Sequence, residues 1–234
     1  MEQIAVLEIP FQFENIKDTI HPVVLIDDNE TILVDCGYVG FLPYIETALV
    51  HNGIDPQSLT KVVITHHDHD HMGALYDLKE KYPWIQVIAS ELDADYVSGK
   101  QKSLRLLQAE TTQNHLPQGQ KEFGKQFIQL LQSVKPVPVD RTVRNDQVLN
   151  WCGGCKVVDT PGHMPGHISL YLPTHRCVIT GDAMALEHGK PVLANPQFAL
   201  DMQAAVDSLE KLLQLDAERF ICYHGGIYQA PCGH

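Results

Sequence analysis

The residues with the clearest capacity for chemistry lie at positions 66–71, which read His-His-Asp-His-Asp-His between Thr65 and Met72-Gly73. Four imidazoles and two carboxylates in six consecutive positions would be costly in a hydrophobic core and would serve no purpose on a solvated surface. Imidazole together with carboxylate is the ligand chemistry that zinc, iron and manganese take in proteins. The segment therefore predicts a metal-binding site.

Four short apolar strands are predicted to end just before side chains that can bind a metal. Each run is rich in Val, Ile or Phe, and a histidine or an aspartate follows it within three residues. The four pairs are 61–65 with His66, 156–160 with His163, 176–180 with Asp182, and 219–223 with His224. Because open α/β sheets gather ligands beyond the carboxyl ends of their strands, these side chains are expected at one site.

The segments that must position this site alternate between strand-like and helix-like patterns, which predicts a layered α/β domain. Strands are expected at 5–9, 22–26, 31–35, 62–64, 84–89, 137–139, 143–149, 155–159, 168–172, 176–180 and 219–223. Helices are expected at 41–52, 72–81 and 201–215. No linker interrupts the alternation, so residues 1–234 are predicted to form a single domain.

Residues 91–133 lack a strand pattern and are rich in Gln, Lys, Leu and Glu. This composition predicts two or three helices, broken near residues 117–119 and inserted into the domain as a cap. The segment carries the cations Lys100, Lys102, Arg105, Lys121 and Lys125. These side chains could form a cationic lid over an anionic substrate or a solvated helical face, and the second interpretation is favoured.

The overall composition excludes several classes of protein. With 29 acidic and 17 basic residues the net charge is −12, which argues against a nucleic-acid binder. No apolar run reaches the length of about 20 residues that a membrane span needs, and the first residues do not form a signal peptide. We therefore expect a cytoplasmic monomer or homodimer that acts on a small molecule, without a nucleic-acid or membrane partner.

The six cysteines are expected to be free thiols, as is usual for a chain without an export signal. Cys152-Gly-Gly-Cys155 could be half of a zinc site or a redox pair. The sequence contains no second C-x-x-C that would complete a four-thiolate site. A tight turn flanked by thiols is therefore the favoured interpretation.

Taken together, the motifs resemble the signature of the metallo-β-lactamase superfamily. That signature is T-H-x-H-x-D-H-x-G, followed by a PGH segment, a Gly-Asp after a strand and a late histidine. The chain supplies these motifs at 65–73, 161–163, 181–182 and 224, and Leu33-Val-Asp35-Cys-Gly37 resembles the superfamily's early Asp-x-Gly. The resemblance implies an α/β fold, a four-layer αββα sandwich of two mixed β-sheets flanked by helices, with a helical insertion.

The resemblance also implies a dinuclear metal site. The first metal would bind His66, Asp68 and His163, the second would bind Asp70, His71 and His224, and Asp182 would bridge the two. His167, four residues after His163, is expected to be a buried imidazole bonded to the backbone or to a ligand carboxylate.

Position 68 departs from the commoner pattern, which has a histidine there. A register shifted by one residue would use His67 and His69, but it would displace Asp70-His71 and Gly73 from their fixed spacing after Thr65. We therefore retain Asp68 as a ligand. Three aspartates would lower the charge of two divalent cations to +1, against +2 for the commoner set. Zinc is expected, with iron or manganese as alternatives at the site that contains Asp68.

The activity implied by the resemblance is hydrolysis by a hydroxide that two metal ions hold and deliver to an electrophilic carbonyl. The substrate would be an ester, a lactone or a thioester of a small molecule. Asp70, which can orient the hydroxide, and Asp182, which holds both metals, are the expected catalytic residues. The alternative is a diiron redox protein similar to the diiron oxygen reductases, and it is supported only by Asp68.

Overall fold

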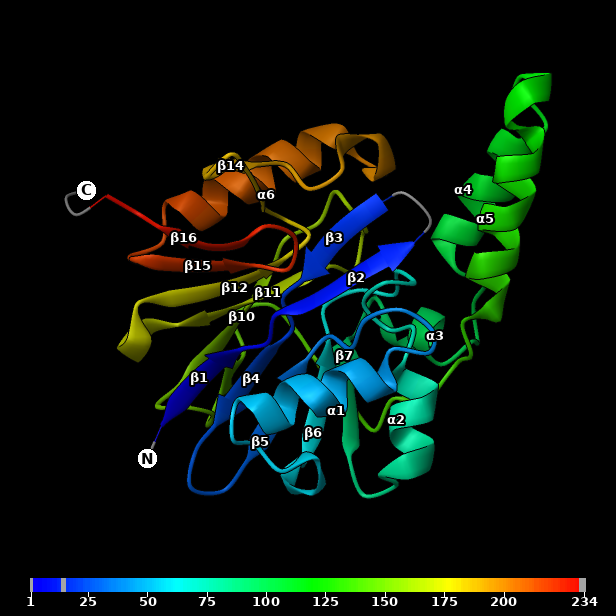
Figure 1. The fold of residues 1–234 in the computed structure, drawn as a ribbon. Coiled ribbons are helices and arrows are strands. Elements are labelled where there is room, and N and C mark those ends of the chain that lie inside the picture. The colour runs from blue at the N-terminus through cyan, green and yellow to red at the C-terminus, as the bar shows by residue number, and fades with distance from the viewer. Residues whose placement is uncertain (1, 14–15, 232–234) are drawn as a thin grey trace.

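The computed structural model describes residues 2–13 and 16–231, and two mixed six-stranded sheets form its centre (Figure 1). In spatial order the first sheet contains β1 (Gln3–Val6), β4 (Val23–Ile26), β5 (Thr31–Val34), β6 (Lys61–Ile64), β7 (Gln86–Ser90) and β8 (Arg141–Val143). The second contains β16 (Gly226–Gln229), β15 (Arg219–Cys222), β12 (Cys177–Gly181), β11 (Ile168–Leu172), β10 (Cys155–Asp159) and β9 (Val148–Leu149). Strands β5 to β8 pair in parallel, as do β12 and β15, and the other pairs are antiparallel.

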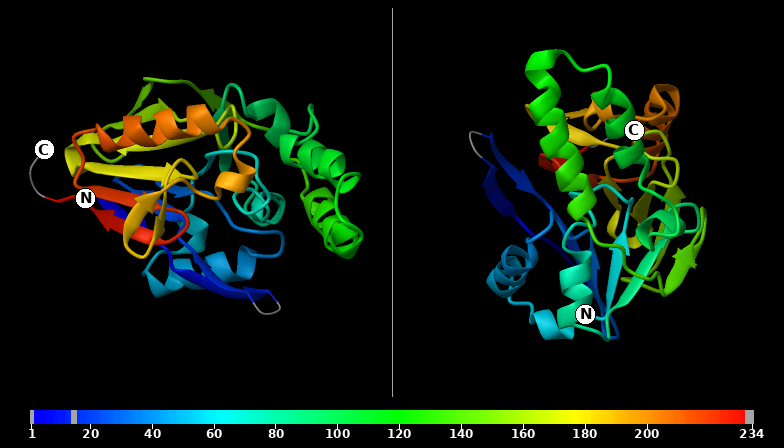
Figure 2. Two further views of the ribbon diagram at one scale, coloured as in Figure 1. Left: turned by 90° about the horizontal axis from the view of Figure 1, so that it is seen from above. Right: turned by 90° about the vertical axis from the view of Figure 1, so that its right-hand side faces the viewer.

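Helices cover the outer face of each sheet and complete the four layers of an αββα sandwich (Figure 2). Helices α1 (Leu42–His51) and α2 (Leu75–Lys81) pack on the first sheet, and α6 (Met202–Leu213) packs on the second. A separate apolar cluster fills the space between the two sheets. This arrangement confirms the predicted fold class.

Strand β6 illustrates how the sequence specifies these layers. Val62 and Ile64 belong to the cluster under α1 and α2, whereas Val63 belongs to the cluster between the sheets. Successive side chains of a strand point to opposite faces, so a strand that is covered on both sides needs a continuous apolar run. The run 62–64 meets that need, and its carboxyl end leads directly into Thr65 and the histidine-rich segment.

The insertion between β7 and β8 is helical, as predicted. It contains α3 (Ala94–Val97), α4 (Leu104–Gln113), a 3₁₀ turn (Gln118–Gln120) and α5 (Lys121–Ser133). Helices α4 and α5 pack against each other as a hairpin whose far end extends beyond the sheets, in green in Figures 1 and 2. None of the described helices is long and apolar enough to cross a membrane.

Three of the predicted strands are wrong. The segment 5–9 is not one strand, because β1 ends at Val6 and the next strand begins at Ile9 outside the first sheet. The segment 143–149 is not one strand, because β8 ends at Val143 and β9 begins at Val148 in the other sheet. Residues 137–139 form no strand, because Pro138 has no N–H to donate to a ladder. Val137 instead donates its N–H to the carbonyl of Val97, which ties this segment to α3.

Two small hairpins lie outside the main sheets and were not predicted. Strands β2 (Ile9–Phe13) and β3 (Ile16–Ile20) form one, and β13 (Ala185–Glu187) and β14 (Lys190–Val192) form the other. Both contribute to the wall of the cavity described below, through Asp18 and Glu187.

Candidate metal centre

The loops that follow β6, β10, β12 and β15 bring all seven predicted ligands together. Three overlapping groups have potential ligand atoms within 4.8 Å of one another. They are His66, Asp68 and His163, then His66, His71 and Asp182, and then Asp70, His71 and His224. All these residues except the half-buried His224 are buried. The sequence therefore identified residues that the fold does place side by side.

Asp182 lies between the two sets of predicted ligands. Its Oδ1 is 3.2 Å from His71 Nε2 and 3.7 Å from His224 Nε2. Its Oδ2 is 3.5 Å from His163 Nε2, on the side of the first set. A carboxylate whose two oxygens face different groups of imidazoles has the geometry that a bridging ligand needs.

Several ligand atoms have no hydrogen-bond partner within the described chain, although they are buried. These atoms are Nε2 of His66, His71 and His224 and Oδ1 of Asp182. Buried polar atoms are nearly always paired in native proteins, so such a cluster requires an explanation. The donor set of imidazole nitrogens and carboxylate oxygens matches the ligands of zinc and of the neighbouring transition metals. The residues present therefore fit divalent cations.

His71 is oriented by Asp35, the residue of the early Asp-x-Gly motif. The Nδ1 of His71 lies 2.8 Å from Asp35 Oδ2, which also accepts a hydrogen bond from the hydroxyl of Thr65. With Nδ1 held by Asp35, the imidazole directs Nε2 toward Asp182 and Asp70. A carboxylate behind a ligating histidine is the usual arrangement in metal sites.

His167 supports Asp182 from behind, in agreement with its predicted role. Its Nε2 accepts a hydrogen bond of 2.9 Å from the backbone N–H of Asp182, and its Nδ1 lies 2.8 Å from the hydroxyl of Thr160. Burial and repulsion from His66 and His163 lower the pKa of His167 well below its usual value. The neutral ring can therefore accept the bond that fixes the backbone of Asp182.

Gly73 closes the loop that carries the histidines. A Cβ at this position would lie 2.3 Å from the carbonyl oxygen of His69 and 2.4 Å from the backbone nitrogen of Val39. No side chain fits in that space. The glycine at the end of the motif is therefore a packing requirement of the same loop.

His67 and His69 belong to none of the three groups of potential ligands. The Nδ1 of His67 lies 2.8 Å from Asp93 Oδ1, its Nε2 accepts from the N–H of Leu104, and its ring stacks on Tyr96. His69 contacts the rings of Tyr38 and Phe127 edge-on. This geometry agrees with the register that was based on the spacing from Thr65 to Gly73.

Arg105 is the residue of this region that sequence analysis misplaced. The favoured interpretation placed it on a solvated face, but its side chain is only 2% exposed and contacts Asp68. Its Nη2 lies 2.7 Å from Asp68 Oδ2 and its Nε lies 3.1 Å from Asp68 Oδ1. Lys100, Lys102 and Lys125 are exposed and Lys121 is half-buried, so the correction concerns the arginine. The sequence around position 105 carried no signal that would separate this arginine from the lysines of the insertion.

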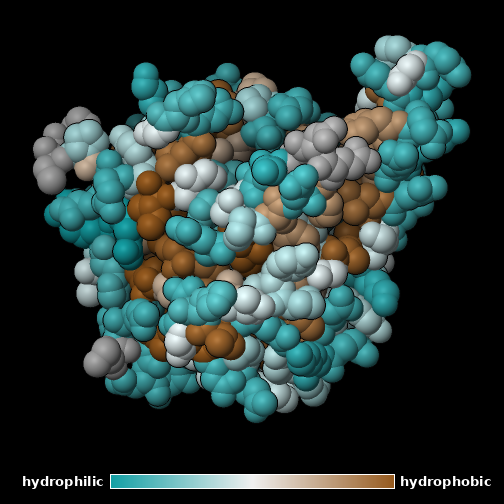
Figure 3. All heavy atoms as spheres, viewed as in Figure 1, coloured by the Kyte–Doolittle hydropathy of each residue, from teal (hydrophilic) through white to brown (hydrophobic). Residues whose placement is uncertain are grey.

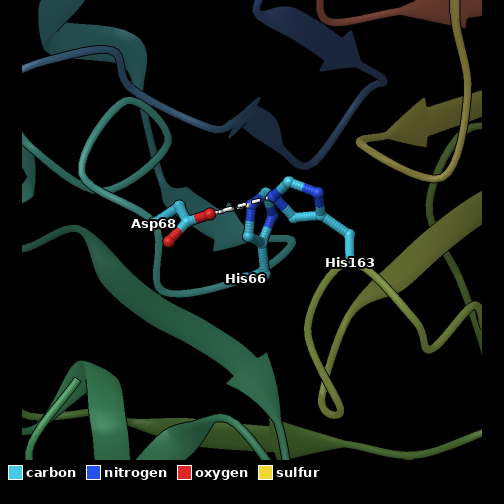
Figure 4. A group of neighbouring side chains, drawn as sticks. All are labelled: His66, Asp68 and His163. Atoms are coloured by element: carbon cyan, nitrogen blue, oxygen red, sulfur yellow. Dashed lines mark hydrogen bonds and ion pairs between the residues drawn. The ribbon is translucent and has the colours of Figure 1, made fainter. Parts of the chain in front are cut away.

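Asp68 is held by three neighbours, of which Figure 4 shows His66 and His163. Its Oδ2 lies 2.9 Å from His163 Nε2 and 3.6 Å from His66 Nε2, in addition to the contacts with Arg105. Burial alone would raise the pKa of Asp68, but the bonds to His163 and His66 and the charge of Arg105 outweigh it. They hold the pKa well below the usual range, so Asp68 is a carboxylate at neutral pH.

The imidazoles of the centre differ in their affinity for protons. Burial would lower the pKa of His71, but the charges of Asp182, Asp35 and Asp70 raise it well above the usual value. Burial and the neighbouring His71 lower the pKa of His66. Protons therefore collect on His71, beside the carboxylates, in the absence of a cation.

A cavity of about 450 Å³ opens onto the centre. Its wall contains Asp68, Asp70, Asp182, His163 and His224, the aromatic side chains of Tyr38, Phe127 and Phe198, and the acids Asp18 and Glu187. Among the lining residues that the structure describes, Arg105 is the one arginine, and none is a lysine. Figure 3 shows exposed apolar residues among the polar ones near the β2–β3 hairpin and beside the insertion. The cavity is therefore acidic, with aromatic walls.

Comparison with known proteins identifies relatives with a related sequence. The probable metallo-hydrolase YflN of Bacillus subtilis (strain 168) is 26% identical over 182 residues, which cover 71% of this chain and 64% of YflN. A hydroxyacylglutathione hydrolase of Ruegeria pomeroyi is 28% identical over 207 residues, covering 86% of this chain and 63% of that enzyme. The chain thus spans slightly less than two thirds of the length of both relatives.

Solved structures share the fold at lower sequence identity. The metallo-beta-lactamase family protein TTHA1429 from Thermus thermophilus has a TM-score of 0.72 and 22% identity, covering 97% of this chain and 74% of that one. ST1585 from Sulfolobus tokodaii, an archaeal metallo-beta-lactamase superfamily protein, has a TM-score of 0.66 and 19% identity, covering 98% and 82%. The sequence pattern of the Metallo-beta-lactamase superfamily matches residues 16–224, which include every predicted ligand. The chain therefore belongs to the metallo-beta-lactamase superfamily.

Proposed function

We propose that the protein is a dinuclear metal-dependent hydrolase that cleaves an ester, lactone or thioester bond of a small molecule. The observation that carries the proposal is the set of buried Nε2 and Oδ1 atoms that face one another without hydrogen bonds. The residues that would hold the first cation are His66, Asp68 and His163, and those for the second are Asp70, His71 and His224, with Asp182 shared. Divalent ions, when bound, lower the pKa of water and polarise carbonyl oxygens.

Asp70 and Tyr38 have properties that suit them for roles at the reacting bond. Burial would raise the pKa of Asp70, but His71, His69 and His224 lower it. The side chain is therefore a carboxylate that can accept a hydrogen bond from water. Burial and the charges of Asp70, Asp18 and Asp182 raise the pKa of Tyr38. Its hydroxyl therefore remains a hydrogen-bond donor that can stabilise negative charge on a substrate oxygen.

The part of the cavity wall away from the candidate metal ligands favours an uncharged or cationic substrate. Asp18 and Glu187 add negative charge to the wall, and the guanidinium of Arg105 already binds Asp68. Among the described lining residues an anionic substrate would find no lysine, and the one arginine is already paired. The name of the relative from Ruegeria pomeroyi specifies hydroxyacylglutathione, and the glutathione part of such a molecule carries carboxylates. We propose that this chain cleaves neutral substrates in preference to a glutathione thioester.

The alternative, a diiron redox function, has little support from the structure. It depended on the carboxylate of Asp68 as a feature that favours iron. Because Arg105 binds both oxygens of Asp68, the carboxylate is charge-compensated and supplies little preference for a harder ion.

The proposal is tested by metal analysis and a substrate panel. The purified protein is stripped of metal, reconstituted with zinc, manganese or iron, and assayed with neutral lactones, neutral thioesters and a glutathione thioester. We expect two equivalents of metal, metal-dependent hydrolysis and a higher kcat/KM for the neutral substrates. Absence of bound metal, or oxygen uptake by the iron form without hydrolysis, would contradict the proposed function. A higher kcat/KM for the glutathione thioester would contradict the substrate preference alone.

A further inference from the structure

Arg105 is the one buried residue of α4, and it brings the helical insertion into direct contact with the candidate metal centre. Its guanidinium is fully engaged. Nε and Nη2 donate to Asp68, and Nη1 donates to the carbonyl of Phe198 and to Gln108 Oε1, each at 2.6 Å. The guanidinium also lies over the ring of Phe198, with its carbon 5.0 Å from the ring centre. A group with its donors occupied in this way has little capacity to bind a substrate.

The charge of Arg105 changes the electrostatics that Asp68 would otherwise impose. Two divalent cations bring four positive charges and the three aspartates remove three, while the adjacent guanidinium adds one. The resulting charge of +2 equals that of the commoner ligand set, in which position 68 is a neutral histidine. The value of +1 predicted from three aspartates is therefore corrected when the arginine is counted.

We propose that Asp68 and Arg105 act as one unit that replaces the commoner histidine, with Arg105 as a positioning residue for the first metal site. The inference rests on the proposed function, because it presumes that His66, Asp68 and His163 bind a cation. The two hydrogen bonds fix the plane of the Asp68 carboxylate, and the positive charge limits the attraction of the site for a cation.

A second consequence concerns the order in which the two sites fill. Asp68 and His163 already have partners, since Arg105 Nη2 lies 3.2 Å from His163 Nε2 and Asp68 lies 2.9 Å from it. Nε2 of His71 and of His224 have no hydrogen-bond partner in the described chain. The guanidinium of Arg105 also lies beside the first site and repels a cation there, so the site of Asp70, His71 and His224 is expected to fill first.

If Asp68 and Arg105 act as one unit, variants at these two positions should differ in metal affinity in a fixed order. Arg105→Gln removes a positive charge, so the affinity for the more weakly bound of the two metal ions should rise by about tenfold or more. Asp68→His leaves a buried guanidinium without its counter-ion beside the cation. The affinity for the more weakly bound metal ion should therefore fall by about tenfold or more. The double variant Asp68→His with Arg105→Gln restores the charge of the wild type, and its affinity should return to within about threefold.

The experiment measures zinc bound to each variant by equilibrium dialysis against zinc buffers, and circular dichroism checks that each variant folds. Lys102→Gln is the matched control, since this lysine is exposed and pairs with Glu110, and its two zinc affinities should equal those of the wild type. Rescue of Asp68→His by Arg105→Gln supports the proposal. Equal affinities for Asp68→His and the double variant would overturn it, because the residues would then act independently.

Two further outcomes keep the test decisive. If Asp68→His does not fold, Arg105→Gln alone decides the question, and an unchanged affinity for its more weakly bound metal ion overturns the proposal. If the wild type binds no zinc, the proposed function itself fails, and this result is distinct from two bound zincs with no coupling between positions 68 and 105.

Discussion

His71 is the residue whose environment bears most directly on how the centre would bind a cation. Asp35 holds Nδ1, and Nε2 faces Asp182 and Asp70 without a hydrogen bond. The same three carboxylates outweigh burial and raise the pKa of His71 well above its usual value. In the metal-free protein this ring is therefore protonated at neutral pH, whereas a metal ligand must be neutral.

Zinc binding should consequently release protons at pH 7. Because the proton on His71 competes with the metal, the apparent affinity should rise as the pH rises toward the elevated pKa, and level off above it. Isothermal titration calorimetry in buffers of different ionisation enthalpy measures the number of protons released. An enthalpy that is independent of the buffer at pH 7 would show that His71 is already neutral before zinc binds.

Asp35→Asn tests the role of the carboxylate behind His71. Asp35 has a φ of 61°, a backbone conformation that asparagine tolerates, so the substitution should preserve the loop. The amide no longer stabilises the imidazole tautomer, and zinc affinity should fall by about 10–100-fold. Chelator competition measures the affinity, with the exposed Asp207→Asn as the control. An affinity equal to that of the wild type would exclude an orienting role for Asp35.

At this scale the sequence pointed to seven residues that the fold brings together, and to His167 behind Asp182, but it missed Arg105. The spacing from Thr65 to Gly73 favoured Asp68 over His67 and His69, and of the three only Asp68 lies in a group that could hold a metal ion. Arg105 could not be predicted, because it lies 37 positions from Asp68 and its neighbours include the exposed Lys102. Nothing in a local pattern indicates which of several cations a helix turns toward a distant loop.

At the scale of elements, His67 links the ligand loop to the helical insertion. It bonds to Asp93 before α3 and to the first N–H of α4, and it stacks on Tyr96. His67→Ala should keep two metals but leave Asp93 without this partner, at a cost of about 1–3 kcal/mol. For a chain of this size the Tm should fall by about 2–12 °C.

Metal analysis and thermal unfolding of His67→Ala check this expectation. His115→Ala, at an exposed position on the same insertion, serves as the control and should change neither quantity. Loss of a metal equivalent from the folded His67 variant would mean that the register of the ligand loop is wrong.

The C-x-x-C lies at the opposite end of β10 from His163. The N–H of Cys152 donates to Asp27, and the chain turns at Gly153-Gly154 into β10, which begins at Cys155. Burial raises the pKa of the Cys152 thiol to about 11 and that of Cys155 to about 12, so thiolate is scarce at neutral pH. This placement agrees with the turn that the sequence favoured.

Replacing Cys152 and Cys155 together by serine should therefore leave the metal content unchanged. Some stability should be lost, because the Cys155 side chain is fully buried. Elemental analysis of the folded double variant decides the matter. A decrease of one metal equivalent would revive a thiolate site at this turn.

Elements that are buried on both faces were the most predictable. The run 62–64 is apolar at each position because both faces of β6 are covered, and no other element fits so short a run. The segment 143–149 looked like one strand because Val143 and Leu149 are both buried between the sheets, although 144–147 cross from one sheet to the other. Apolar residues at both ends of a segment do not show where a chain changes sheets.

At the scale of the whole molecule, the two sheets serve to bring four strand ends to one edge. Strand β6 leads to His66, β12 to Asp182 and β15 to His224, while the loop after β10 carries His163. The insertion then adds Arg105 from a fifth direction. A centre assembled from residues 35 to 224 exists only when the entire sandwich has folded. Its candidate ligands could be located because the family motifs mark the strand ends, whereas the cavity walls arise from hairpins and helices without such motifs.

Asp182 is the residue at which this architecture converges, since its two oxygens face the two sets of imidazoles. The most direct measurement of the proposed dinuclear centre is therefore the metal content and hydrolytic activity of Asp182→Ala beside the wild type, with Asp207→Ala as the control. The wild type and the control should bind two equivalents and hydrolyse the same substrate. Asp182→Ala should lose at least one equivalent and nearly all hydrolysis. Two retained metals with wild-type activity in Asp182→Ala would contradict the account.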